Sequence, residues 1–353
     1  MSSSPAYAAD ALTRFAEALF RAAGLKNEMA RDVAEVLVEG DLLGHDTHGL
    51  ALAAPYLDEI EAGAMTRAGE PDVLSNSGAA VLWDGNMLPG PWLTRRAVQL
   101  VCDRAQRHGL AAVSIRRSHH IASLMAYLSA ATERGLMLLI ATSDPADASV
   151  APFGGLRAVF TPDPIAVGIP TKRDPILIDL SSSITTNAMT QRLRSQGECF
   201  PGAWAIDAKG QPSNDPTVMA ADPPGTLLPT GGLDHGHKGY GLALTVEALT
   251  QGLAGHGRAD RPTGWGAGVF VQALDPAAFG GPEAFRRQTE WIAESCRSNP
   301  PRPGVERVRL PGERSLARRR QGLAQGLSLR PEILHALLPW ATRFDIPLPQ
   351  PVL

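Results

Sequence analysis

The sequence predicts an α/β fold with a layer of helices contributed by the two ends of the chain. From about Val73 onward, short β-rich apolar runs alternate with helical patterns, as is typical of an α/β domain. Before that point, the apolar residues follow helical periodicity. A chain of 353 residues with 44% hydrophobic residues can bury a large core. We therefore expect a helical layer over residues 1–72, joined by a C-terminal helix at 315–353, and an α/β domain over 73–314.

The first part of the chain is predicted to form three helices. Apolar side chains recur at helical spacing within residues 8–23, and Gly24 stands where a helix commonly stops. We expect a second helix capped by Asn27 and a third over residues 50–60. The layer is expected to end near Gly63.

The other elements are predicted from shorter patterns. Apolar runs between Gly, Pro and Asp predict strands, and 3.6-residue periodicity predicts helices. We expect strands at 79–83, 110–115, 136–141, 165–169, 175–179, 264–274 and 305–310, and helices at 92–108, 121–134, 242–253 and 331–344. Residues 280–303 are the best candidate for a mobile surface segment.

Composition narrows the classes of function. The net charge of −3 gives no reason to expect binding to nucleic acid or to an anionic membrane. No apolar run reaches the ~20 residues that span a bilayer, and the N-terminus does not resemble a secretory signal. Cys102, Cys199 and Cys296 lie far apart and form no CxxC pair. We therefore expect a reduced, cytoplasmic protein.

The segment Gly44–Gly49 places His45, Asp46, Thr47 and His48 between two glycines. Glycine permits close approach of a ligand to the backbone, and imidazole exchanges protons near neutral pH. His48 is therefore a candidate acid or base. The alternative is a helix end with solvated histidines.

Two further clusters strengthen the functional interpretation. Ser118, His119 and His120 stand where a predicted strand meets a helix, the usual place for ligands in α/β proteins. Gly231–Gly241 combines glycines with Lys238 at a predicted helix start, which suits a phosphate. The alternatives are structural histidines and an ordinary flexible loop.

Two other kinds of site are less well matched. The histidines have no spacing such as HExxH, so we expect no metal. No GxGxxG follows a strand, and residues 264–268 lie in the wrong context. If a dinucleotide binds, it does not use the Rossmann fingerprint.

Taken in order, the motifs resemble those of the malate/L-lactate dehydrogenase family of the second, non-Rossmann type. That family includes ureidoglycolate dehydrogenase, diketogulonate reductase, sulfolactate dehydrogenase and Δ1-piperideine-2-carboxylate reductase. The resemblance extends over nearly the whole chain, from about Leu12 to Ile346. The matching segments are Gly44–Gly49, Ser118–His120, Asp163–Ala166, Asp179–Ser181, Pro201–Trp204, Asp215–Pro216, His237–Leu244 and Pro311–Glu313.

This resemblance implies a homodimeric NAD(P)-dependent oxidoreductase with NADH or NADPH as cofactor and a small-molecule substrate. Its fold is a non-Rossmann one in which the α/β domain binds the nicotinamide cofactor. Hydride transfer needs an acid or base beside the reacting carbon, which the histidines can supply. The resemblance assigns catalysis to His120 and His48, and substrate binding to Thr47, Leu52, Tyr56 and His119. It assigns cofactor binding to Ser143, Asp179, Leu180, Ser181, Ser182, His237, Lys238, Pro311, Gly312 and Glu313.

The chain also departs from the family pattern. The arginine that usually follows the first histidine motif, and would hold a substrate carboxylate, is Leu52 here, and a usual Gly-Lys is Ala188-Met189. Leucine cannot replace the bidentate pairing of arginine with a carboxylate. We therefore expect an unusual 2-keto/2-hydroxy acid or a cyclic imine as substrate, and poor activity on malate and lactate, unless Arg116 or Arg117 supplies the charge. The competing hypotheses are a catalytically silent relative that binds a nucleotide or a partner, and a metal-dependent hydrolase.

Overall fold

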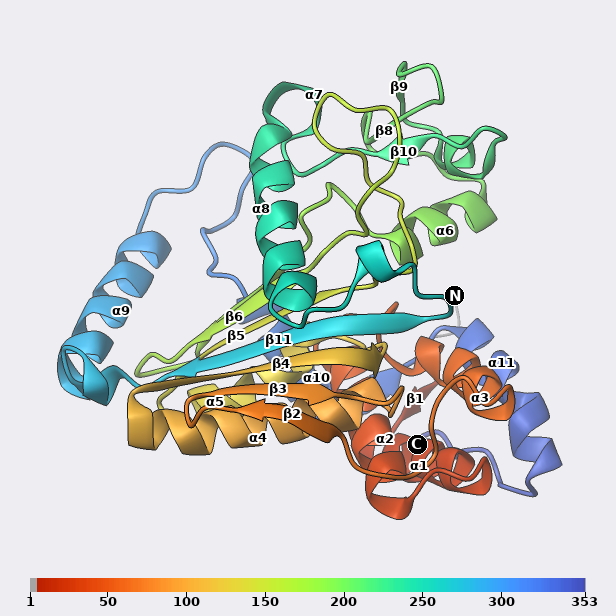
Figure 1. Cartoon of the computed structure of the whole chain (residues 1–353), viewed down its shortest axis with the longest axis horizontal. Coiled ribbons are helices and arrows are strands. Elements are labelled where there is room, and N and C mark those ends of the chain that lie inside the picture. Colours follow the sequence, from red (N-terminus) through yellow and green to blue (C-terminus); the bar gives the residue numbers. More distant parts are fainter. Residues whose placement is uncertain (1–4, 353) are drawn as a thin grey trace.

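The computed structural model describes residues 5–352 and confirms the α/β class. Its central sheet has seven strands in the order β2-β3-β4-β11-β5-β6-β7 (Figure 1). Only β3 and β4 run parallel in this sheet, and every other neighbouring pair is antiparallel. The strands are Ala6–Tyr7 (β1), Asp72–Asn76 (β2), Ala80–Asp84 (β3), Leu110–His119 (β4), Met137–Ser143 (β5), Ile165–Ile169 (β6), Ile176–Leu180 (β7), Ala205–Ile206 (β8), Pro212–Ser213 (β9), Thr226–Leu227 (β10), Gly266–Leu274 (β11) and Leu327–Ser328 (β12).

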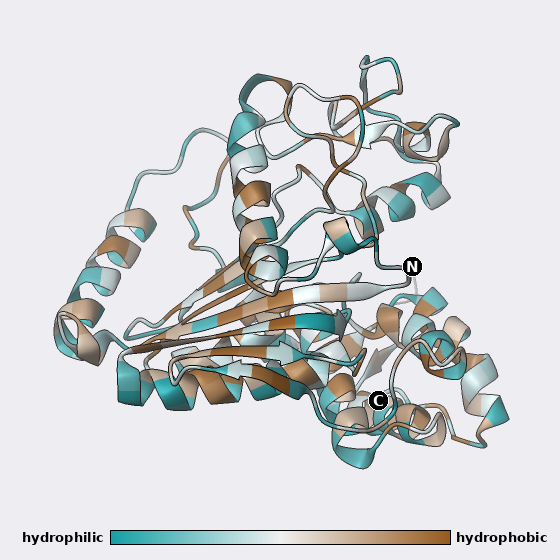
Figure 2. Ribbon diagram, viewed as in Figure 1, coloured by the Kyte–Doolittle hydropathy of each residue, from teal (hydrophilic) through white to brown (hydrophobic). Residues whose placement is uncertain are grey.

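Strand β11 holds the sheet together although it comes late in the chain. It pairs with β4 on one side and β5 on the other, so that Val271 lies opposite both Val113 and Ile140. All three side chains are buried. Figure 2 shows hydrophobic residues along the strands of this sheet.

Helices from both ends of the chain pack against the sheet. The helices are Ala9–Ala22 (α1), Asn27–Leu42 (α2), Ala53–Glu61 (α3), Gly90–His108 (α4), Ser129–Thr132 (α5), Asn187–Gln196 (α6), Gly232–His235 (α7), His237–Glu247 (α8), Pro282–Arg297 (α9), Glu313–Gln325 (α10) and Pro331–Arg343 (α11). Leu37 of α2, Trp92 of α4 and Leu337 of α11 belong to one hydrophobic core with β11. The pairing of β1 with β12 fastens the two chain ends to each other. Because the core is continuous from helices to sheet, the boundary at residue 72 stays a prediction.

A smaller lobe stands above the central sheet in Figure 1. It contains α6, α7, α8 and the three-stranded sheet β10-β8-β9. Its own core includes Val150, Phe160, Leu193 and Leu227. Short 3-10 helices complete the fold at Leu50–Leu52 (η1), Leu124–Tyr127 (η2), Pro216–Ala220 (η3), Arg258–Asp260 (η5) and Pro276–Ala278 (η6), with a π-helix at Ala248–Gly252 (η4).

Several predicted elements differ from the structure. Asn27 is the first residue of α2 rather than its cap; the N-cap is Lys26, whose side chain forms no capping bond. The helix expected to end at Arg134 is only η2 and α5, and the strand expected at 305–310 is not regular structure. The segment 280–303, expected to be a mobile surface segment, contains the 16-residue helix α9, which was not predicted. The C-terminal helix is two helices, α10 and α11, separated by β12.

Residues 1–4 and 353, which the two terminal predictions include, lie outside the described residues. Within residues 5–352, no helix is long and apolar enough to cross a bilayer.

Gly90, the first residue of α4, allows that helix to approach the end of β4. A Cβ at Gly90 would lie 2.2 Å from the carbonyl oxygen of His119 and 2.4 Å from that of His120. These neighbours are backbone atoms, so the clash cannot be relieved by a side-chain rotation. The close contact fixes the histidine pair relative to α4.

We predict that Gly90→Ala lowers the free energy of unfolding by about 1–3 kcal/mol or more, because it overpacks this contact. Urea denaturation followed by circular dichroism measures the change. Gly241→Ala is the matched control: Gly241 is also helical, a Cβ there meets no atom within 4 Å, and alanine favours helix. Equal effects of the two substitutions would contradict the prediction.

Candidate active site

A cleft of about 900 Å³ lies where the helical layer, the central sheet and the smaller lobe meet. Its walls include the loop 44–48, the residues after β4, the end of β7 and one face of α6. His48, His120, Asp179 and Arg192 all contribute to its lining. The structure therefore brings the first two predicted histidine segments to one place.

The loop that carries His48 is held by a buried carboxylate. Asp41, in the last turn of α2, accepts a hydrogen bond of 2.8 Å from the backbone N–H of Leu50. A Cβ on Gly49 would lie 2.2 Å from Asp41 Oδ1, so glycine is needed at this position. Burial raises the pKa of Asp41 to about 7. Sequence analysis missed Asp41, although a carboxylate at the end of an apolar helical run was a usable signal.

His120 is positioned by a fully buried tyrosine. Tyr56 Oη lies 2.7 Å from His120 Nδ1 and 3.2 Å from the His120 carbonyl oxygen. The backbone N–H of Ala122 also donates to His120 Nδ1, at 3.3 Å. Trp265, which the sequence analysis did not identify, stacks on the imidazole with ring centroids 4.8 Å apart. These contacts use Nδ1 and fix the plane of the ring, so Nε2 is the nitrogen left for a ligand.

His48 and His120 are both neutral at pH 7. Their ring centroids are 5.8 Å apart. Burial, with a smaller effect of His45, lowers the pKa of His48 to about 4. Burial, reinforced by His48 and His119, lowers the pKa of His120 well below its usual value. A neutral imidazole can accept a proton from a substrate hydroxyl.

Three predicted substrate contacts do not lie in the cleft lining. Tyr56 and His119 are both 0% exposed, and His119 Nε2 is 3.3 Å from Glu59 Oε2. Leu52 packs against the main core. His48 and Leu52 do not share a helix, because His48 lies in a turn and η1 begins only at Leu50. Thr47 does line the cleft, and its Oγ1 is 3.0 Å from His48 Nδ1.

The opposite wall contains the segment after β7. Asp179 accepts a 3.0 Å hydrogen bond from the Met125 N–H and lies 3.8 Å from His45. Burial raises its pKa against the effect of His45. Leu180 and Ser181 line the cleft, whereas Ser182 is fully buried and donates to the Pro162 carbonyl.

Two further predicted cofactor segments pack beside this wall. A Cβ on Gly239 would lie 2.4 Å from the Ser182 carbonyl oxygen, which places the first turn of α8 directly against that residue. His237 and Lys238 are exposed in this turn. It is already helical, whereas the helix was expected to begin at residue 242. The Pro311 carbonyl accepts a hydrogen bond of 3.2 Å from the Leu177 N–H in β7. Gly312 packs against Leu177 and Glu313 pairs with Arg297 at 2.6 Å.

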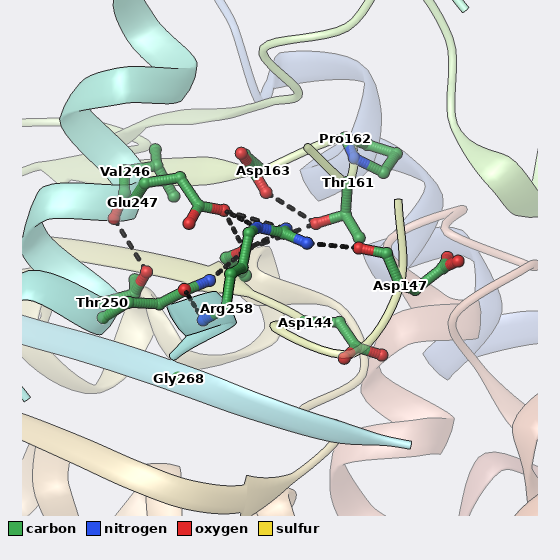
Figure 3. A network of polar contacts seen from close by, with 12 residues as sticks. Asp144, Asp147, Thr161, Pro162, Asp163, Val246, Glu247, Thr250, Arg258 and Gly268 are labelled. Atoms are coloured by element: carbon green, nitrogen blue, oxygen red, sulfur yellow. Dashed lines mark hydrogen bonds and ion pairs between the residues drawn. The ribbon is translucent and has the colours of Figure 1, made fainter. Parts of the chain in front are cut away.

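Ser143 belongs to a buried polar network beside the cleft instead of lining it. Its hydroxyl donates to Glu247 Oε1 at 2.7 Å and accepts from Gln251 at 3.1 Å and Arg258 at 3.2 Å. Figure 3 shows Arg258 at the centre of this network, between Glu247 and the loop that contains Asp147. The prediction that Ser143 contacts the cofactor is therefore not supported by its placement.

Asp163 lies at the edge of the same network (Figure 3). It accepts a 2.6 Å hydrogen bond from Thr161 Oγ1, and its second carboxyl oxygen is buried with no hydrogen-bond partner among residues 5–352. Burial, and then the charge of Glu247, raise its pKa to about 8. Within the described residues no group of three or more His, Cys, Asp or Glu side chains is placed to hold a metal ion.

Comparisons with known proteins agree with this geometry. A family model described as malate/L-lactate dehydrogenase matches residues 7–338. An L-lactate dehydrogenase of Cupriavidus necator is 32% identical over 329 residues, covering 91% of this chain and 93% of that protein. An L-sulfolactate dehydrogenase of Methanothermobacter thermautotrophicus is 28% identical, covering 94% of each chain.

Solved structures show the same architecture. The Δ1-piperideine-2-carboxylate reductase of Pseudomonas syringae superposes with a TM-score of 0.83 at 27% identity, covering 95% of this chain and 99% of that one. A malate dehydrogenase of Entamoeba histolytica has a TM-score of 0.92 at 23% identity, covering 99% of this chain and all of that one, and shows the fold alone. The chain belongs to the malate/L-lactate dehydrogenase family. It is accordingly a nicotinamide-dependent dehydrogenase or reductase.

We predict that Asp163 makes the protein less stable as the pH rises from about 4 to about 8. In this window the folded chain retains a proton on Asp163 that the unfolded chain, with a pKa near 3.8, has released. Asp163→Asn removes this dependence. The free energy of unfolding of the variant, relative to that of wild type, therefore increases by about 1 kcal/mol for each unit by which the pH rises. Urea denaturation at pH 6 and pH 8 tests this. A difference between variant and wild type that stays constant with pH would refute it.

Proposed function

We propose that this protein transfers a hydride between nicotinamide and a 2-keto/2-hydroxy acid or a related cyclic imine. The observation that carries the proposal is the pair of neutral imidazoles, His48 and His120, in a cleft whose opposite wall includes Asp179 and Ser181. Relatives named for lactate, sulfolactate and Δ1-piperideine-2-carboxylate share a carboxylate next to the carbon that reacts. We therefore propose the same substrate class for this protein.

His120 is the proposed proton carrier. Oxidation of a hydroxy acid releases a proton from the hydroxyl as hydride leaves the carbon, and a neutral imidazole accepts it. Tyr56 Oη is within reach of both His120 Nδ1 and the His120 carbonyl, so it can donate to either one. The hydroxyl can serve two tautomers of the ring. It donates to Nδ1 in the Nε2–H tautomer, to which the Ala122 N–H also donates, and it accepts from Nδ1–H in the tautomer whose free Nε2 takes the substrate proton, where the Ala122 bond is given up. We assign Tyr56 and His119 to positioning this ring, with His48 and Thr47 beside the substrate.

The cofactor is proposed to lie along Asp179–Ser182, the first turn of α8 and the turn 311–313. Nicotinamide supplies or accepts the hydride when it is bound. The chemistry of these segments fits such a ligand: Leu180 and Ile184 give the cleft wall an apolar part. Lys238 adds an exposed cation at a helix N-terminus, which suits phosphate. Both NADH and NADPH are candidates.

An atypical substrate is part of this proposal. Position 52 offers no charge, and Arg116 and Arg117 are both paired with Asp84, at 2.9 and 2.8 Å. A second carboxylate such as that of malate would be buried without its usual partner, which is costly. We expect 2-keto monoacids with an apolar group larger than a methyl, or a cyclic imine, to be better substrates than malate or lactate.

The experiment that tests the function is a substrate panel. Oxidation of NADH and NADPH is followed with 2-keto acids and cyclic imines, and reduction of NAD⁺ and NADP⁺ with the hydroxy acids, malate and lactate included. Turnover of at least one of these compounds is expected. Cofactor binding with no turnover of any compound would favour a catalytically silent relative.

We also propose that the protein is a cytoplasmic homodimer. Phe279, Trp291 and Ile292, on or beside α9, are 64%, 66% and 48% exposed, and Figure 2 shows hydrophobic bands on this helix. Clustered exposed apolar residues are typical of interaction surfaces. The three free cysteines support a reducing compartment. Sedimentation velocity measures the state of association.

We predict that His120→Ala lowers turnover by roughly 10²–10⁴-fold, because it removes the proton acceptor. The dissociation constant for the cofactor, measured by fluorescence titration, stays within about twofold of wild type. His335→Ala, at an exposed position on α11, is the control and retains full activity. Full activity of the His120 variant would transfer the role to His48.

We predict that Lys238→Ala raises the dissociation constant for the cofactor tenfold or more, equivalent to about 1.4 kcal/mol. The substitution removes a point charge from the start of α8, where a phosphate is favoured. Lys209→Ala removes an exposed lysine from the turn between β8 and β9 and leaves the constant unchanged. An unaltered constant in the Lys238 variant would exclude this residue from the cofactor site.

A further inference from the structure

We infer that Arg192, on α6, binds the carboxylate of the substrate. This inference rests on the proposed function and names a residue for it. Arg192 lines the same cleft as His48 and His120, and its side chain is 31% exposed. Helix α6 is fixed at its start by Thr186, whose hydroxyl accepts a hydrogen bond from the Met189 N–H. The helix ends at Gly197, so Arg192 stands on a rigid element rather than in a loop.

The guanidinium of Arg192 has unused hydrogen-bonding capacity. Its Nε is buried and has no hydrogen-bond partner within the part of the chain that the structure describes. Its Nη1 lies 3.8 Å from Asp46 Oδ2, which is an ion-pair distance but too long for a hydrogen bond. A buried donor without an acceptor is costly to the folded chain. A bound carboxylate would relieve that cost and form the bidentate pair that arginine favours.

The ion pair between Arg192 and Asp46 is weak, so a ligand carboxylate can compete with Asp46 for the guanidinium. Asp46 is 45% exposed and is shared with Arg330, whose Nε lies 3.5 Å from it. An exposed, shared ion pair contributes little. Glu198 lines the cleft as well, and among residues 5–352 it forms no ion pair with Arg192.

Other cations near the site are already engaged. Arg116 and Arg117 bind Asp84, and Arg258 binds Glu247 at 2.9 Å within the buried network. Arg330 has Glu332 at 3.3 Å in addition to Asp46. The Nε of Arg330 also lacks a hydrogen-bond partner within the described residues, but Arg330 does not line the cleft. Arg192 is the arginine in the cleft lining, and its buried N–H is free for a ligand.

The position of Arg192 suits the chemistry of a 2-keto or 2-hydroxy acid. In these compounds the carboxylate is bonded to the carbon that exchanges hydride. The protein cation that binds this carboxylate must therefore lie close to the histidine that exchanges the proton. Asp46, which Arg192 approaches, is two residues from His48, and its charge acts on the pKa of that histidine. Met189, one helical turn before Arg192, also lines the cleft. The ligand class is therefore a monocarboxylate with an apolar substituent.

The test compares Arg192→Met with Arg194→Met, in the full chain with NADH bound. Arg194 is on the same helix but does not line this cleft. Oxamate, an unreactive 2-keto acid analogue, is titrated calorimetrically. We expect Arg192→Met to raise the dissociation constant for oxamate by at least about 30-fold, and Arg194→Met to leave it unchanged. Arg192→Lys, which keeps the charge but loses the planar fork, recovers part of the affinity.

A second readout separates binding from a merely structural role. Asp46→Asn removes the ion pair but leaves Arg192 in place, so oxamate binds at least as tightly as to wild type. If Arg192 only held the loop of Asp46, Asp46→Asn would weaken oxamate binding as much as Arg192→Met does. That result overturns the inference. The affinity for NADH, unchanged in every variant, reports that the chain is folded.

The remaining outcomes distinguish the inference from the function on which it rests. Equal oxamate binding by wild type and Arg192→Met, with 2-keto acid turnover retained, overturns the role of Arg192 and leaves the function standing. No oxamate binding and no turnover by the wild type overturn both. A selective loss of kcat/KM for pyruvate in Arg192→Met, with that for the uncharged pyruvamide unchanged, supports both.

Discussion

The contact among His120, Tyr56 and Trp265 is the constraint on which the site depends. His120 follows β4, Tyr56 comes from α3 and Trp265 immediately precedes β11. Residues from the helical layer, from the end of β4 and from the start of β11 therefore all contact the imidazole of His120. Gly90 adds α4 to this contact by allowing backbone to approach backbone. A shift in any of these elements would move the ring that is proposed to carry the proton.

Burial has the largest effect on the protonation of this site. It lowers the pKa values of His48 and His120 and raises those of Asp41 and Asp163. Each group is driven toward its neutral form, because a charge is costly where water is excluded. In such surroundings a cation with a free N–H donor binds an anionic ligand more strongly than it would at the surface. Arg192 lines the same cleft as the two uncharged imidazoles.

Backbone contacts join the smaller lobe to the end of β7. The Thr230 N–H donates to the Ser182 carbonyl at 2.7 Å, and Gly239 packs against both residues. The Ser182 N–H in turn donates to the Pro162 carbonyl at 2.8 Å. These contacts place the start of α8 beside the end of β7. The two segments expected to hold the cofactor are therefore adjacent although about 55 residues separate them.

The sequence by itself determined the fold class, most element positions and the family. Periodicity located α1, β6 and β11 because each buries a regular apolar face, and the ordered motifs identified the family. It did not locate α9, whose apolar residues are largely exposed, or the start of α8 among glycines. Only the tertiary structure decided that β11 enters between β4 and β5, that Tyr56 lies behind His120, and that Leu52 faces the core. It also brought Arg192 to the cleft. These features arise from contacts between residues far apart in the chain, and spacing along the sequence does not encode which distant surfaces meet.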